Sequence, residues 1–348
     1  MVPLSALKAW QLKHAAFLMG LPSTGTKAAL EAVLRARLDA RQRAKLLERP
    51  HRVLSVDMGI RNLAYCVVDV PEDYSSSSRV PLTVSTWRKR DLTTTATSSE
   101  TAMPEAPEEA RTPSRRRRPK VSIANAVDTT LFTPSVLSKT AYAITTDLLA
   151  LNPDTILIER QRFRSGGASA IQEWTVRVNM LESMLWACLY TLDTQHQQGD
   201  AQPFPSVHEV NPARVAQFWT SETGVSLVAD GDTFQASAQP PEQADAGAHV
   251  KEGRRKVQKK DKIAIARRWL AGEDSEVRLE FEGQAAEVAK VFGRKGRVRL
   301  REEGIGANVD VGKLDDLADC LLQGVAWVRW DENAERLRRI LRAGGDEI

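Results

Sequence analysis

Cysteine is scarce in this chain, and long apolar stretches are missing. The 348 residues include three cysteines, far apart and without a CxxC pair, which excludes a disulfide framework and a paired-cysteine zinc site and favours a reducing compartment. No run of about 18 apolar residues occurs, so we expect no transmembrane helix and no membrane partner. We also expect no small-molecule cofactor.

Acidic residues are absent from the first 30 positions, which carry Lys8, Lys13, His14 and Lys27. Such a segment can resemble an organellar transit peptide, but a DNA-binding element, described below, explains the same residues better. The net charge of +4 and the pI near 9.0 are modest. Because the basic residues are bunched, the sequence predicts a nucleic-acid partner.

Carboxylates in three separated segments carry the main chemical signal. Asp57 and Glu159 end two apolar runs rich in β-branched residues, VLSVD and TILIE, and the third segment, KLDDLADCLL, is a predicted amphipathic helix with Asp315, Asp316 and Asp319. Gathered carboxylates are costly unless a cation lies between them, and hard ions such as Mg²⁺, or Mn²⁺ in its place, bind through oxygen ligands. Two ions roughly 3.5–4 Å apart stabilise both the attacking and the leaving oxygen of a phosphodiester. The pattern predicts a metal-dependent nuclease.

The three helix aspartates cannot all face one metal pair. Asp316 and Asp319 are spaced i, i+3, and Asp315 and Asp319 are spaced i, i+4, so either pair shares a helix face. Asp315 and Asp316 point about 100° apart. Taken singly, each acid has an ordinary explanation as a turn residue or a helix cap, so the prediction depends on the order of all three segments.

Residues 1–48 are predicted to form a small helical module. Leucines recur at helical spacing, GLPSTGTK interrupts them with turn residues, and a second helix resumes at Ala28. The pattern Leu-x-x-Leu-Lys, followed by Gly20, Gly25 and Lys27, resembles the SAP motif, a helix-loop-helix DNA-binding element. Such a loop suits phosphate contact through Lys27. The alternative is a helical hairpin that caps the domain.

Residues 50–330 are predicted to form one α/β domain. VLSVDMG, LAYCVVDV and PLTVSTWRKRDL alternate as three antiparallel strands, and helix-strand units containing DTILIE and PSVHEV follow. This order predicts an RNase H-like mixed five-stranded sheet flanked by helices. Two segments poor in apolar residues, about 93–120 and 229–252, are predicted to be disordered inserts. An acidic helix over 312–329 and a separate basic helix over 331–348 are expected to end the chain.

Three of these segments together carry a family resemblance. SVDMGIRNLAYCVVD, ILIERQRFRS and KLDDLADCLLQGVAW resemble the fungal mitochondrial Holliday junction resolvases, a RuvC-like branch of the RNase H-like fold. The resemblance implies a mitochondrial homodimer that binds a four-way DNA junction. It also implies paired, Mg²⁺-dependent nicks that leave 5'-phosphate and 3'-hydroxyl ends.

The resemblance also implies roles for the acids. Asp57 would bridge two Mg²⁺ ions, Glu159 would hold the metal with the nucleophilic water, and Asp316 with Asp319 would complete the site. The pair Asp316 and Asp319 is preferred because the RuvC-like pattern separates two aspartates by two small or apolar residues. Asp315 would then support the ligands or interact with the helix dipole.

Basic and polar residues near these segments are predicted to contact DNA. Arginines that directly follow Glu159 would flank the cut phosphate, because guanidinium groups suit bidentate phosphate recognition. The predicted DNA-binding residues are Lys27, Arg61, Asn62, Arg160, Gln161, Arg162, Arg164, Lys259, Lys260 and Lys262. The Arg115–Arg118 run has two open interpretations, a grip on the DNA backbone and a non-specific tether or localisation signal.

Two other functions fit parts of the sequence. One is a non-enzymatic architectural protein that binds DNA junctions, but the intact acid set argues against it. The other is an RNase H-like nuclease that processes RNA, and the SAP-like start favours DNA over this alternative.

Overall fold

A six-stranded mixed sheet forms the centre of the computed structural model, which describes residues 3–40, 50–72, 74, 80–93, 132–161, 173–196, 203–221, 257–294 and 314–343. The strand order is β5-β4-β1-β2-β3-β6. Strands β1, β2 and β3 are antiparallel neighbours, whereas β4 runs parallel to β1, β5 to β4, and β6 to β3. The strands are β1 His51–Asp57, β2 Leu63–Val70, β3 Leu82–Arg90, β4 Thr155–Glu159, β5 Ser206–Val210 and β6 Leu279–Phe281.

This sheet confirms the predicted RNase H-like order and corrects the expected strand number from five to six. Strand β6 adds three residues to the edge beside β3. Three residues are too few to show the period-two alternation by which a strand is recognised. The sequence therefore predicted the first five strands and missed the sixth.

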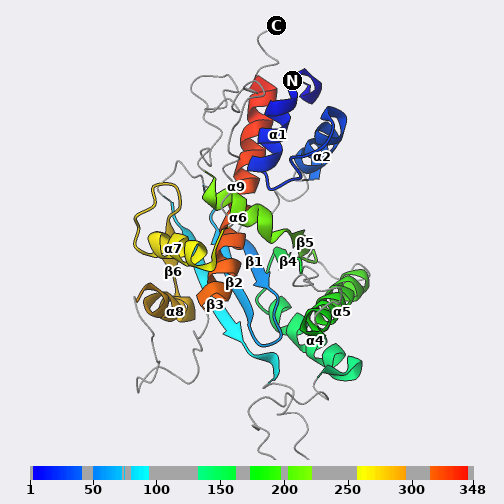
Figure 1. Ribbon diagram of the computed structural model, residues 1–348, viewed down its shortest axis with the longest axis vertical. Coiled ribbons are helices and arrows are strands. Elements are labelled where there is room, and N and C mark those ends of the chain that lie inside the picture. Colours follow the sequence, from blue (N-terminus) through cyan, green and yellow to red (C-terminus); the bar gives the residue numbers. More distant parts are fainter. Residues whose placement is uncertain are drawn as a thin grey trace, which may run out of the picture.

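Helices cover both faces of the sheet (Figure 1). Leu54 and Val56 of β1 pack into a core with α4 and α5, whereas Val53, one residue before, packs into a second core with α6 to α9. This division follows from the alternation of side chains along a strand. The helices are η1 Leu4–Ala6, α1 Ala9–Leu18, α2 Lys27–Ala40, α4 Pro134–Leu149, α5 Glu173–His196, α6 Pro212–Thr220, α7 Lys259–Leu270, α8 Gly283–Gly293 and α9 Leu314–Ala343.

Helix α9 is one continuous helix, which corrects the expected separate basic helix over 331–348. No glycine or proline interrupts the chain between Trp330 and Leu341, so nothing there stops a helix. The change from acidic to basic composition near residue 331 is a change of surface charge along one helix. The buried stripe continues past that point through Leu337 and Leu341.

The N-terminal helices α1 and α2 pack against the C-terminal half of α9 (Figure 1). Asn333 donates a hydrogen bond to the backbone oxygen of Leu18 at 2.8 Å, and Arg37 forms an ion pair with Asp331 at 2.6 Å. The predicted helix-loop-helix is therefore present, and its core is continuous with that of the sheet domain. Its role in DNA binding stays a prediction.

Several predicted segments lie outside the described residues. These are nearly all of the insert over 93–120, the insert over 229–252, and the Arg115–Arg118 run. Among the helices that the structure describes, none has the length and apolar character needed to cross a membrane.

Candidate metal centre

The ends of β1 and β4 bring two acids side by side. Val56 pairs with Ile158 across the parallel ladder, so Asp57 and Glu159, which directly follow them, end neighbouring strands together. Paired residues of neighbouring strands point to the same face of a sheet. Ser55, two residues before Asp57, donates a hydrogen bond to the backbone of α9. Both carboxylates therefore lie on the face that α9 covers.

Helix α9 adds the third carboxylate. Carboxylate oxygens of Asp57, Glu159 and Asp319 all lie within 4.8 Å of one another, and each residue is partly buried. Hard divalent cations take oxygen ligands of this kind. We refer to these three residues as the acid cluster. The sequence predicted that they meet, and the donor set fits a divalent metal ion.

The acid cluster is electrostatically unfavourable by itself. Burial is the largest of the causes that raise the pKa of Asp57 well above its ordinary value. The negative charges of Glu159 and Asp319 raise this pKa further. Burial also raises the pKa of Asp319. A bound cation favours the ionised form of nearby carboxylates, so a divalent ion would offset both effects. Shifts of this kind are typical of functional sites.

Lys262 of α7 is a positive partner within the cluster. Its Nζ lies 2.7 Å from Asp319 Oδ1 and 2.8 Å from Oδ2. The positive charge of Lys262 lowers the pKa of Asp319 and so opposes the effect of burial, which raises it. The sequence assigned Lys262 to DNA contact, and the structure places it against an acid of the cluster.

Asp315 and Asp316 lie outside this group of three acids. Asp315 forms an ion pair with Lys259, and Asp316 Oδ2 lies 3.4 Å from the Nζ of Lys89, whose side chain is 4% exposed. The charge of Asp316 still reaches the cluster, because it contributes to the raised pKa of Asp57. The sequence interpretation preferred Asp316 as a ligand, and direct coordination by Asp315 or Asp316 stays a prediction.

Lys89 is a basic residue beside the acid cluster that the sequence interpretation missed. Asp57 pairs with Ala64 on β2, and Ala64 pairs with Lys89 on β3, so the lysine points to the same sheet face as Asp57. Trp87, two residues earlier, is fully buried. Lys89 follows Trp87 at the two-residue spacing that places side chains on one face of a strand, and this spacing is the signal that could have identified it.

Arg160 and Gln161 continue the chain beyond the acid of β4. Arg160 is half-exposed, and its Nη1 lies 3.1 Å from Glu209 Oε1 on the neighbouring strand. The backbone of Gln161 donates a hydrogen bond to a carboxylate of α5. Arg162 and Arg164 lie outside the described residues. DNA contact by these four residues stays a prediction.

Arg61 and Asn62 lie in the turn that joins β1 to β2, directly after Asp57. Arg61 is exposed and its guanidinium carbon lies 5.6 Å from the ring centroid of Trp174. Gly59 approaches the Asn62 backbone so closely that a Cβ would lie 3.0 Å from the Asn62 oxygen. The tight turn thus keeps both residues at the acid-bearing end of the sheet.

The remaining predicted DNA contacts lie on α2 and α7. Lys27 is exposed, and its Nζ donates a hydrogen bond to the Ser5 backbone oxygen at 2.6 Å. Lys260 is exposed in the first turn of α7, between the two lysines that pair with α9. DNA contact by Lys27 and Lys260 stays a prediction.

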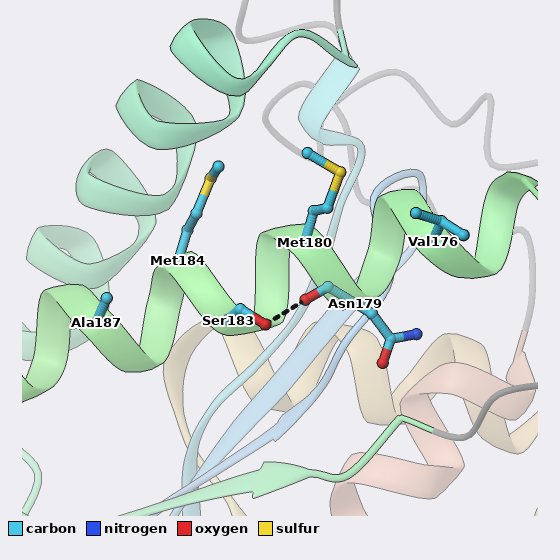
Figure 2. Close-up of a pocket in the computed structure, with 6 residues that line it drawn as sticks. All are labelled: Val176, Asn179, Met180, Ser183, Met184 and Ala187. Atoms are coloured by element: carbon cyan, nitrogen blue, oxygen red, sulfur yellow. Dashed lines mark hydrogen bonds between the residues drawn. The ribbon is translucent and has the colours of Figure 1, made fainter.

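A separate open pocket of about 380 Å³ lies along α5. Figure 2 shows Met180 and Met184 projecting from one side of the helix, with Val176 and Ala187 further along it. The lining residues carry no charge. Asn179 and Ser183 complete the lining, and the pocket is separate from the acid cluster.

Comparisons with known proteins agree with this fold. A cruciform cutting endonuclease 1, mitochondrial, from Schizosaccharomyces pombe is 25% identical over 335 residues, which cover 95% of each chain. The crystal structure of the yeast mitochondrial Holliday junction resolvase Ydc2 matches 97% of this chain and 98% of its own, with a TM-score of 0.55 and 22% identity. The family model described as mitochondrial resolvase Ydc2 / RNA splicing MRS1 matches residues 53–337. The chain belongs to this family.

Proposed function

We propose that this chain is a mitochondrial structure-selective endonuclease that resolves four-way DNA junctions by paired, metal-dependent nicks. The observation that carries the proposal is the acid cluster, in which oxygens of Asp57, Glu159 and Asp319 lie within 4.8 Å of one another at one end of the sheet. The cluster occurs in a member of a family that includes a mitochondrial resolvase. The S. pombe relative is named as a mitochondrial endonuclease that cuts cruciforms.

The acid cluster would hold Mg²⁺, with Mn²⁺ as a substitute. The ion would supply positive charge to the attacking and leaving oxygens and activate a water molecule. Asp57 and Glu159 hold their carboxylates on rigid strands, and Asp319 adds a third from α9. Ligands on such elements are held more firmly than ligands on loops. We expect 5'-phosphate and 3'-hydroxyl products.

Basic groups at the same end of the sheet would hold the phosphates around the cut. Arg61 and Arg160 flank the two acid-bearing strand ends, and both side chains are accessible. Arg offers a planar, permanently charged fork for phosphate oxygens. Lys260 and Lys27 would add contacts further from the cut. Binding through these groups should weaken as the salt concentration rises.

We further propose that the protein acts as a homodimer. Paired nicks in two strands need two active sites, and the described part of one chain contains one acid cluster. The pocket along α5 offers uncharged side chains to the second copy, with Val176 41% exposed beside the half-buried Met180 and Met184. Depletion of charged residues is typical of the centre of an interface.

RNA is the second candidate substrate, because the family description also names RNA splicing MRS1. The test is to incubate the purified protein and Mg²⁺ with three labelled substrates: a four-way DNA junction, a linear DNA duplex of the same sequence and a four-way RNA junction. Symmetric nicks in the DNA junction alone support the proposal. Cleavage of the RNA junction alone would move the assignment to RNA processing, and tight binding without cleavage would favour an architectural role.

A further inference from the structure

Gln323 is a buried amide directly beneath the acid cluster. It lies on α9 one helical turn after Asp319 and is 1% exposed. Its Nε2 lies 3.0 Å from Ser55 Oγ, 3.3 Å from the backbone oxygen of Val56 and 3.5 Å from that of Leu157. One side-chain amide therefore contacts both strands whose ends carry acids of the cluster.

The chemistry of its neighbours determines the orientation of this amide. The two backbone carbonyl groups can only accept hydrogen bonds, so they require the NH₂ group and exclude the oxygen. Ser55 uses its own proton in a 2.7 Å hydrogen bond to the Cys320 backbone oxygen, so its Oγ is an acceptor for Gln323. The amide hydrogens thus point to the sheet.

The oxygen of the same amide, Gln323 Oε1, has different surroundings from the NH₂ group. Gln323 Oε1 is buried and accepts no hydrogen bond from the residues that the structure describes. Gln323 also lines a small cavity, about 10 Å³ in volume, together with Glu159, Lys262 and Asp319. The Gln323 side chain therefore contacts β1 and β4 through its NH₂ group and also lines a cavity beside two acids of the cluster.

We propose that Gln323 is a positioning residue for the acid cluster, holding β1, β4 and α9 at the spacing that a divalent ion requires. Val56 directly precedes Asp57, and Leu157 is two residues before Glu159, so the amide acts close to both carboxylates. Three carboxylates repel one another, and partners that orient the ligands keep such a set together. The effect of Gln323 on catalysis rests on the proposed function, whereas its effect on metal binding does not.

The test compares two buried amides on α9. Gln323→Met keeps the apolar volume but removes the donor and acceptor groups. Asn333→Leu is the matched control, because Asn333 is also buried and donates a hydrogen bond to a backbone oxygen, that of Leu18. The measurements are Mn²⁺ affinity of the metal-stripped protein by electron paramagnetic resonance, and unfolding by urea in EDTA.

Gln323→Met should weaken Mn²⁺ affinity by about tenfold, in the range known for groups that orient metal ligands. Asn333→Leu should lower stability while leaving Mn²⁺ affinity within about twofold of wild type, because distant sites act independently. Ser55→Ala removes one of the three partners of Gln323 and should weaken affinity less. This variant preserves the test if Gln323→Met does not fold.

Unchanged Mn²⁺ affinity in Gln323→Met and Ser55→Ala would overturn the inference, as would equal losses in Gln323→Met and Asn333→Leu. Failure of the proposed function has a different signature. A wild-type protein that binds Mn²⁺ but cuts no junction would overturn the nuclease assignment, and the comparison of variants would still decide the role of Gln323.

Discussion

Lys262 and Asp319 face each other across the contact between α7 and α9, with the lysine Nζ 2.7 Å from Oδ1 and 2.8 Å from Oδ2. Both side chains are about one-fifth exposed. A positive charge therefore lies directly against one acid of the cluster. In the metal-free protein, this lysine partly offsets the repulsion among the three carboxylates.

Removal of Lys262 should destabilise the metal-free protein. Lys262→Met leaves Asp319 buried without its positive partner, which should lower the free energy of unfolding by about 1–3 kcal/mol. The double variant Lys262→Met/Asp319→Asn should recover much of this loss, because the unpaired charge is then absent. Urea unfolding in EDTA measures both. A double variant no more stable than Lys262→Met would show that the two side chains do not interact in solution.

Asp57→Asn should stabilise the metal-free protein at neutral pH. The raised pKa of Asp57 means that the folded state holds a proton over a pH range in which the unfolded state has released it, so stability falls as pH rises through that range. Asparagine removes this dependence. The melting temperature in EDTA should exceed that of wild type at pH 7, and the difference should shrink toward about pH 4. A lower melting temperature at pH 7 would contradict the electrostatic account.

Gly20 should tolerate substitution less well than Gly272. Both have φ of +67°, so alanine at either position costs about 1–2 kcal/mol of backbone strain. At Gly20 a Cβ would also overlap the ring of Trp330 on α9, whereas at Gly272 nothing lies within 4 Å. Gly20→Ala should therefore lose about 1–3 kcal/mol more, from overpacking. If urea unfolding gave equal losses in the free energy of unfolding for Gly20→Ala and Gly272→Ala, this would argue against the contact between the N-terminal helices and α9.

Met184→Glu should disrupt the proposed dimer. A carboxylate in the uncharged surface of α5 would be buried without a partner in the complex. Light scattering after gel filtration should give a monomer, whereas Ala36→Glu, on an exposed position of α2, should leave the dimer intact. A Met184→Glu protein that remains dimeric would place the interface elsewhere.

Much of the sheet and part of the site were predictable from local patterns. The runs before Asp57 and Glu159 alternate or are continuously apolar, so their strands and the positions of both acids at strand ends followed from the sequence alone. Strand pairing then brought the acids together.

The rotation and length of α9 were not predictable in this way. Which aspartate faces β1 depends on how α9 is rotated about its own axis where it packs on the sheet. Gly324 faces the sheet and lets the helix pack closely in this rotation, since a Cβ there would lie 3.2 Å from Val68 and 3.3 Å from Ser55. This packing leaves Asp319 in the cluster and turns Asp316 toward Lys89. Contacts between distant elements leave no periodic signal in a single sequence.

The most direct test of the central claim is cleavage of a labelled four-way DNA junction by wild-type protein and Asp57→Asn, each with Mg²⁺ and with Ca²⁺. The account predicts symmetric nicks by the wild type with Mg²⁺, sealable by DNA ligase, and junction binding without nicks by the variant. Nicks by Asp57→Asn at the wild-type rate would contradict the assignment of the acid cluster as the catalytic metal site.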